Sequence, residues 1–285
     1  MTTPLAGAAV RAAGARRAVA CALAAVLLSG CAQSVDPIER MGRKAAQKVR
    51  HHPRTGTGTA AGAPAPGAHR RWGLAAPLAP APPAHRVLPP RAPGAVPPVV
   101  DHVPTREKVV FLTYDDTYRD TYDHGAGDDA RFVDMVRDLR LPISMFLTHP
   151  VGAPGHDHFG RLRALGAGIE NRTLTHPFLP GLGYVEQHAE ICGQQDHLKA
   201  RFGTAPRLLR PPHGTYDADT LRAAGACGID AIVLGRASTQ NDALRPGDII
   251  LTGFRKETSP TETTARTLRR IQEQGFTVGR LEDYL

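Results

Sequence analysis

The pattern of hydrophobic and polar residues from Arg106 to the end of the chain predicts strands and helices in alternation. Short runs rich in β-branched and aromatic residues are typical of strands, and amphipathic stretches with apolar residues at helical spacing lie between them. This alternation favours parallel strands joined by crossover helices, in a doubly wound sheet or a shortened barrel. The expected strands are 108–114, 143–147, 167–171, 207–210, 231–234, 248–251 and 277–281, and the expected helices are 129–140, 158–165, 185–202, 218–226 and 261–274.

The chain before Arg106 shows neither periodicity. Of the 25 Pro residues, 13 lie within residues 51–105, mixed with Ala, Gly, Arg and His. Such a segment cannot bury enough apolar surface to offset the entropy that ordering would cost. We therefore expect residues 31–105 to form a disordered basic tether and residues 106–285 to form the folded domain. Within the tether, residues 36–50 are either a solvated charge run or a short basic helix that lies on anionic lipid or wall polymer.

The first thirty residues have the pattern of an export signal. Three arginines within the first 17 residues precede an uncharged run at 18–28. That run is too short to cross a membrane, which needs about 20 apolar residues. The ending Leu28-Ser29-Gly30-Cys31 resembles a bacterial lipobox, which implies removal of residues 1–30, lipidation of Cys31 and attachment to the outer face of the cell membrane. A plain secretory signal is the alternative.

Charge divides the chain at the same place. Residues 1–105 contain 13 Lys and Arg against 3 Asp and Glu, a net charge of +10, whereas residues 106–285 contain 22 against 24, a net charge of −2. The whole chain has a pI near 9.7. The folded domain nevertheless lacks the excess of basic residues that would attract the phosphate backbone of a nucleic acid. Nucleic acid is therefore excluded as the expected partner.

Two cysteines belong to the predicted folded domain, Cys192 and Cys227. An exported protein meets an oxidising compartment, and the two residues lie on or beside consecutive crossover helices that should pack side by side. We expect them to form a disulfide, with two buried free thiols as the alternative.

Polar residues suited to chemistry follow three of the predicted strands. Asp115 and Asp116 stand at the end of the first strand, where successive side chains point to different sides, so that one can bind a metal ion while the other faces water. His176 lies in the loop after the third strand. Arg210 follows the fourth strand and precedes two prolines and His213. The carboxyl ends of parallel strands share one edge, so we expect these residues to collect there.

In this order, the motifs resemble those of the polysaccharide deacetylases of the NodB-homology type, family four of the carbohydrate esterases. The resemblance covers about residues 106–285 and implies a distorted (β/α)₇ barrel. It also implies hydrolysis of N- or O-acetyl groups on an acetylated polysaccharide or peptidoglycan with a divalent metal such as zinc. By similarity, Asp115 would be the general base, Asp116 and His176 metal ligands, Arg210 the residue that orients the base, and the backbone N–H of His213 an oxyanion donor.

The chain departs from the family pattern at positions that carry this chemistry. Arg172 stands where the family has its first metal-binding histidine, which leaves two protein ligands and places a positive charge beside the ion. Gly253 stands where the family has its general acid, and glycine has no side-chain proton to donate. Thr117 replaces the glycine after the Asp pair, and Val233-Leu234-Gly235-Arg236 replaces the segment that contains tryptophan.

These departures leave three hypotheses. The first is an active, divergent deacetylase in which loop histidines rebuild the site. The second is a catalytically impaired relative that keeps the sugar cleft and binds the cell wall, with Arg172 neutralising the two aspartates in place of an ion. The third is a lipid-anchored scaffold whose basic tail carries the function. The histidines considered for the first hypothesis are His124, His149, His156, His158 and His213.

Overall fold

The computed structural model describes residues 66–90, 92–116, 129–148, 156–237, 243–253 and 259–285. No helix within these ranges is long and apolar enough to cross a membrane. The helices are α2 (Ala68–Arg71), α4 (Ala130–Leu139), α5 (His156–Ala164), α6 (Tyr184–Phe202), α7 (Ala218–Ala226) and α8 (Pro260–Glu273). The strands are β1 (Val99–Val100), β2 (Val109–Asp116), β3 (Ile143–Leu147), β4 (Gly168–Asn171), β5 (Leu208–Leu209), β6 (Ala231–Val233), β7 (Arg236–Ala237), β8 (Ile249–Gly253) and β9 (Thr277–Gly279).

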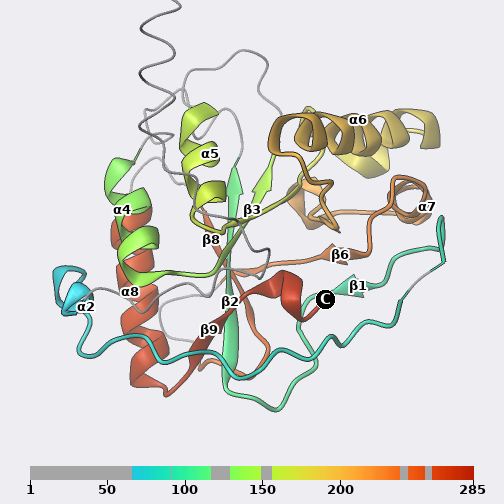
Figure 1. The fold of residues 1–285 in the computed structure, drawn as a ribbon. Helices are drawn as coiled ribbons and strands as arrows, with labels where there is room; N and C mark the ends of the chain where they lie inside the picture. Colours follow the sequence, from blue (N-terminus) through green and yellow to red (C-terminus); the bar gives the residue numbers. More distant parts are fainter. Residues whose placement is uncertain (1–65, 91, 117–128, 149–155, 238–242, 254–258) are drawn as a thin grey trace, which may run out of the picture. The chain divides into compact units, whose positions relative to one another are not determined.

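These strands form one curled parallel sheet (Figure 1). The strand order is β1-β6-β5-β4-β3-β2-β8-β7, and β9 pairs with β2 outside this path. All of the described strand pairs are parallel. The predicted α/β fold with crossover helices is therefore confirmed, and the strands begin and end within two residues of the expected positions, apart from the two additional short strands β1 and β7.

The side chains of strand β2 alternate between two hydrophobic clusters, one on each face of the sheet. Val110, Leu112 and Tyr114 belong to the cluster that includes residues of α4 and α8. Val109 and Phe111 belong to a second cluster with residues of β5, β6 and the C-terminus. Successive side chains of a strand point to opposite faces, so a continuously apolar strand is buried on both. This burial fixes the register of β2 and thereby the position of Asp115 at its end.

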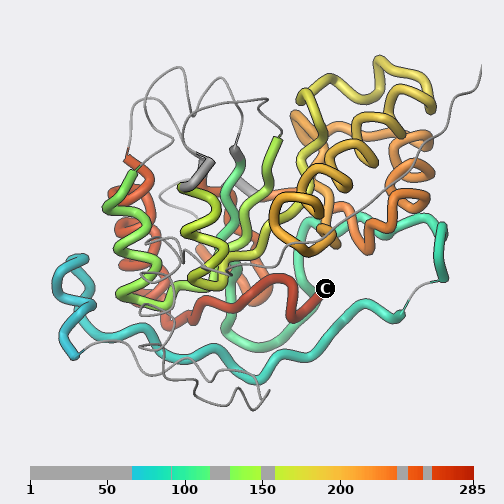
Figure 2. The backbone as a smooth tube through the Cα atoms, turned by 45° about the horizontal axis from the view of Figure 1, so that its top comes forward, coloured from blue at the N-terminus to red at the C-terminus, as the bar shows by residue number. Residues whose placement is uncertain are grey.

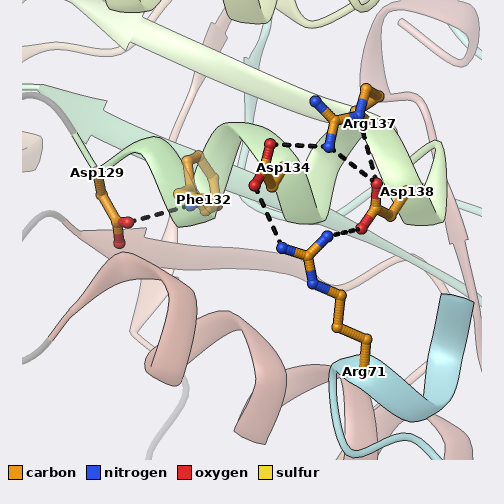
Figure 3. A network of polar contacts seen from close by, with 6 residues as sticks. All are labelled: Arg71, Asp129, Phe132, Asp134, Arg137 and Asp138. Atoms are coloured by element: carbon orange, nitrogen blue, oxygen red, sulfur yellow. Dashed lines mark hydrogen bonds and ion pairs between the residues drawn. The ribbon is translucent and has the colours of Figure 1, made fainter.

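Asp129 is the N-cap of α4 and also binds the first residues of α8, whose own N-cap is Ser259. The Asp129 carboxylate accepts a hydrogen bond from the backbone N–H of Phe132, as Figure 3 shows, and others from the hydroxyls of Ser259 and Thr261. Although burial acts to raise the pKa of Asp129, these hydrogen bonds outweigh it and lower that pKa. A charged carboxylate at two helix amino termini also complements both helix dipoles.

Residues 66–105 differ from the expected tether because they pack on the domain. Trp72 and Leu74 lie in the main hydrophobic cluster and are 5% and 4% exposed. Val99 and Val100 form β1, which pairs with β6, and Val103 is completely buried. Figure 2 shows this segment, blue to green, running along the outside of the domain. Isolated apolar residues on an extended chain have no period, so the hydrophobic pattern did not predict their burial.

Polar contacts hold the same segment near its start and near its middle. The guanidinium of Arg71 contacts Asp138 at 2.8 Å and Asp134 at 3.3 Å, both on α4 (Figure 3). Further along, the backbone N–H of Val87 donates to the carbonyl of Tyr284 at 2.8 Å. The folded unit therefore begins well before Arg106.

The structure contains the predicted disulfide between Cys192 and Cys227, with a Cα–Cα distance of 5.1 Å. Cys192 lies within α6, and Cys227 is the residue that follows the last turn of α7. The bond joins two helices that are neighbours along the chain.

Candidate active site

Asp115 lies at the carboxyl end of β2, where the sheet curls. Its register partners are Phe146 of β3 and Gly253 of β8. The side chain is 11% exposed. Gly253, the residue at the family's general-acid position, therefore stands directly beside Asp115 on the neighbouring strand and offers no side chain.

Arg210 follows β5 and is held from several strands. Its Nη1 contacts Asp115 Oδ1 at 2.7 Å, and its Nε donates to the carbonyl of Val233 at 3.3 Å. The guanidinium carbon lies 4.0 Å from the centre of the Phe146 ring. A Cβ atom at Gly235 would lie 3.2 Å from that carbon, so only glycine leaves room for the guanidinium there. With 2% exposure, Arg210 is a fixed, buried cation.

Arg172, in the loop after β4, binds the other oxygen of the same carboxylate. Its Nη1 lies 2.8 Å from Asp115 Oδ2, and its side chain is 9% exposed. Asp115 is thus clamped between two buried guanidinium groups, one on each oxygen. Charge-assisted pairs of this kind are strong in a site from which water is excluded. The sequence suggested that Arg172 neutralises aspartate, and the structure pairs it with Asp115.

The loop that carries Arg172 and His176 is anchored to α6. The side chain of Asn171 accepts from the backbone N–H of Thr173 at 2.8 Å and donates to the carbonyl of Ile191 at 2.9 Å. Sequence reasoning did not identify Asn171, although an amide at a strand end is a common signal for such a loop. Glu190, also on α6, binds the backbone N–H and the hydroxyl of Thr175.

Three residues of the site have left-handed backbones. Thr173 has φ 64°, His176 has φ 62° and His213 has φ 58°. Non-glycine residues rarely adopt this conformation, and the strain is tolerated where the surroundings hold it. The rings of His176 and His213 meet edge to face, with centroids 4.9 Å apart. The structure thus brings together the two predicted histidines, with His213 exposed and His176 partly buried.

Other predicted site residues are placed elsewhere or lie outside the described side chains. The backbone of Asp116 ends β2, but its side chain is outside the described part. His124 and His149 are outside the described residues, as is the side chain of His156. His158 was considered as a loop histidine of the site, although it also begins the expected helix 158–165. It lies on α5, completely buried, with its ring 5.3 Å from that of Phe159, so the loop placement is wrong and the helix prediction holds.

The described residues do not fit the metal ion that the family resemblance implies. Both oxygens of Asp115 are engaged by arginines, and the Arg172 guanidinium occupies the neighbourhood in which a third ligand would be needed. Among the described side chains, no three potential donors gather at this end of the sheet. A catalytic zinc site normally has three protein ligands and no cation beside them.

Comparison with known proteins agrees with the fold. The polysaccharide deacetylase family model matches residues 102–232. An uncharacterised protein of Streptomyces coelicolor is 48% identical over 202 residues, which cover 67% of this chain and 78% of that protein. A chitooligosaccharide deacetylase of Bradyrhizobium is 27% identical over 51% of this chain and 79% of its own length. A family 4 carbohydrate esterase from Bacillus anthracis superposes with a TM-score of 0.55 at 22% identity, covering 65% of this chain and 85% of that structure.

Proposed function

Since residues 102–232 match the polysaccharide deacetylase domain, we propose that the protein binds an acetylated polysaccharide of the cell envelope without metal and without hydrolysing it. This is the impaired-relative hypothesis of the sequence analysis. The observation that carries it is the double clamp on Asp115, whose two oxygens are bound by Arg172 and Arg210 at 2.8 and 2.7 Å.

The clamp and Gly253 together leave the site without groups that acetyl hydrolysis needs. A general base needs an oxygen that faces water, and Arg172 binds the Asp115 oxygen that Arg210 does not bind. A general acid must protonate the leaving amine, and Gly253 beside Asp115 cannot. General acid–base catalysis contributes about 10²- to 10⁴-fold to the rate in such reactions.

The same site keeps groups that bind sugars. The exposed ring of His213 and the partly buried ring of His176 offer hydrogen bonds to hydroxyl or acetamido groups. The two rings pack edge to face on each other, which restricts their rotation and lowers the entropy cost of binding a ligand. Lipidation of Cys31, also part of the proposal, would present this site on the outer face of the membrane.

The test compares wild type with Arg172→His and with Arg172→His plus Gly253→His. Wild type should hold no stoichiometric zinc and release no acetate from acetylated chito-oligosaccharides, yet bind them in calorimetry. Arg172→His should gain zinc, because an imidazole replaces a cation. It should gain little acetate release, since Gly253 still cannot protonate the leaving group, and the double variant should release more.

The matched control is Arg222→His, which makes the same substitution at an exposed arginine of α7 that pairs with Asp219 and lies over the Tyr184 ring. It should bind glycan as wild type does and, like wild type, hold no stoichiometric zinc. Stoichiometric zinc with fast acetate release by the wild-type protein would show an active deacetylase and end the proposal. Absence of glycan binding by wild type would remove the binding role.

A further inference from the structure

A second cluster of chemically reactive side chains lies away from the Asp115 site, between α6 and α7. His188 and Cys192 stand four residues apart on α6, so they share one face of the helix. Cys227, at the end of α7, completes the group. The His188 ring nitrogen and the two sulfur atoms all lie within 4.8 Å of one another, and all three residues are partly exposed.

The spacing within this cluster matches that of a tetrahedral metal site. With Zn–S near 2.3 Å and Zn–N near 2.0–2.1 Å, tetrahedral angles require sulfur and nitrogen roughly 3.5 Å apart and two sulfurs roughly 3.8 Å apart. Cys192 Sγ and His188 Nε2 are already 3.4 Å apart. The two sulfurs are joined as a disulfide and must separate for both to bind a metal ion.

We propose that His188, Cys192 and Cys227 form a zinc site when the disulfide is reduced, and that disulfide formation closes this site. Two thiolates and one imidazole are ligands that zinc prefers, and a water molecule would complete the fourth position. Partial exposure gives both a reductant and the ion access. The site is independent of the Asp115 cluster and of the function proposed above.

The chemistry balances with an external dithiol as the reductant. Its two thiols supply two electrons and two protons, which cleave the Cys192–Cys227 bond into two thiols, while the reagent becomes a cyclic disulfide. Zinc binding then displaces the two cysteine protons, which leave with solvent. In the reverse step a small-molecule disulfide takes two electrons from the zinc-bound thiolates and is cleaved to two thiolates, while the Cys192–Cys227 bond reforms and the ion is released.

The experiment titrates Co²⁺ into the full chain carrying Cys21→Ser and Cys31→Ser, which removes the two other cysteines, before and after reduction and with the reductant removed. This parent chain, when reduced, should bind one equivalent with the ultraviolet charge-transfer absorption of a thiolate–cobalt bond, and zinc should abolish that absorption by displacing cobalt. The oxidised protein should show none. The absorption reports sulfur ligation, so the other histidines of the chain do not contribute to it.

Variants of the parent chain separate the three donors from the fold. His188→Ala should weaken cobalt binding about tenfold or more, as loss of a ligand does. His197→Ala removes a histidine of the same helix outside the cluster and should bind as the parent chain does. Cys192→Ser with Cys227→Ser should lose the absorption entirely. Circular dichroism of each reduced protein monitors folding.

Three results would overturn the proposal. A reduced, folded parent chain without the absorption would show that no site forms. Unchanged affinity in His188→Ala would show that the histidine is not a ligand. A reduced chain that unfolds and that zinc does not refold would show that the helices cannot hold the three donors without the disulfide.

Discussion

Glu170 and Glu282 are two carboxyl groups buried together at the amino-terminal end of the strands. Glu170, 4% exposed, accepts hydrogen bonds from the backbone N–H groups of Arg207 and Leu208 at 2.8 and 2.7 Å. Burial raises the pKa of Glu170 well above its usual range, and the charge of Glu282 adds to this. Burial also raises the pKa of Glu282. Each carboxyl group therefore favours its neutral form more strongly in the folded protein than it would in water.

We predict that Glu282→Gln stabilises the protein at neutral pH. A carboxyl group whose pKa is raised by folding stabilises the folded protein fully below its pKa in the unfolded chain, which is near 4.3. That stabilisation is lost as the pH rises through its pKa in the folded protein. A neutral amide of the same shape should therefore raise the melting temperature more at pH 7 than at pH 4. Thermal unfolding at both pH values measures this difference.

Glu186→Gln, on the exposed first turn of α6, is the control and should change both melting temperatures equally. If Glu282→Gln also changed both melting temperatures equally, the pKa of Glu282 would not be raised in the folded protein.

Sequence reasoning identified Asp115, His176, Arg210 and His213 because each follows a predicted strand, and parallel strands end at one edge. Its impaired-relative hypothesis had Arg172 neutralise Asp115 and Asp116, but no local pattern showed that Arg172 reaches Asp115. Arg172 follows β4 and Asp115 lies at the end of β2, and β3 lies between these two strands. Flat sheets space alternate strands by roughly 10 Å, so the contact depends on the curl of the sheet and on the reach of an arginine, which no local pattern contains.

At the scale of elements, α2 is attached to the domain by two neighbouring residues of different kinds. Arg71 is 55% exposed and makes its ion pairs to α4 at the surface. Trp72 is 5% exposed and packs in the main cluster. The Arg71 guanidinium also lies 4.8 Å from the Trp72 ring centre.

We predict that these neighbours differ strongly in their contribution to stability. Trp72→Ala should lower the free energy of unfolding by about 3 kcal/mol or more, because it opens a cavity in the core. Arg71→Ala should lower it by about 1 kcal/mol at most, because solvent screens an exposed ion pair. Urea denaturation of both variants gives the two values, and equal losses would contradict the assignment of the anchor to Trp72.

The disulfide between α6 and α7 gives a further prediction. It closes a loop of 35 residues, and loop-closure entropy assigns such a bond a stabilisation of roughly 4 kcal/mol at most. Cys192→Ser with Cys227→Ser should reduce the free energy of unfolding by that order. Urea unfolding of the double variant measures it, and a loss below about 1 kcal/mol would mean that helix packing alone holds α6 on α7.

At the scale of the whole molecule, the segment 66–105 belongs to the folded unit. We predict that a chain beginning at residue 66 melts as the full protein does, whereas one beginning at residue 106 melts at least about 10 °C lower. The shorter chain lacks Trp72, Leu74, Val100 and Val103, all buried. Circular dichroism of both fragments tests this, and coinciding melting curves would restore the view of residues 66–105 as a tether.

Lipidation of Cys31 is the prediction that concerns location. Wild type should incorporate labelled palmitate and sediment with membranes, because the segment 28–31 resembles a lipobox. Cys31→Ala should do neither. Equal labelling of the two proteins, or labelling of neither, would leave a plain secretory signal as the explanation.

The pairing of β2 with distant strands has a kinetic consequence. β2 is the partner of β8 and β9, whose residues follow it by more than 130 positions. Contacts of such long sequence separation make folding slow. At about 5–20 residues per second of synthesis, β2 emerges roughly 7 to 30 s before β8 is available. During that interval β3 is the only described neighbour of β2 that has been made, so the centre of the sheet cannot close.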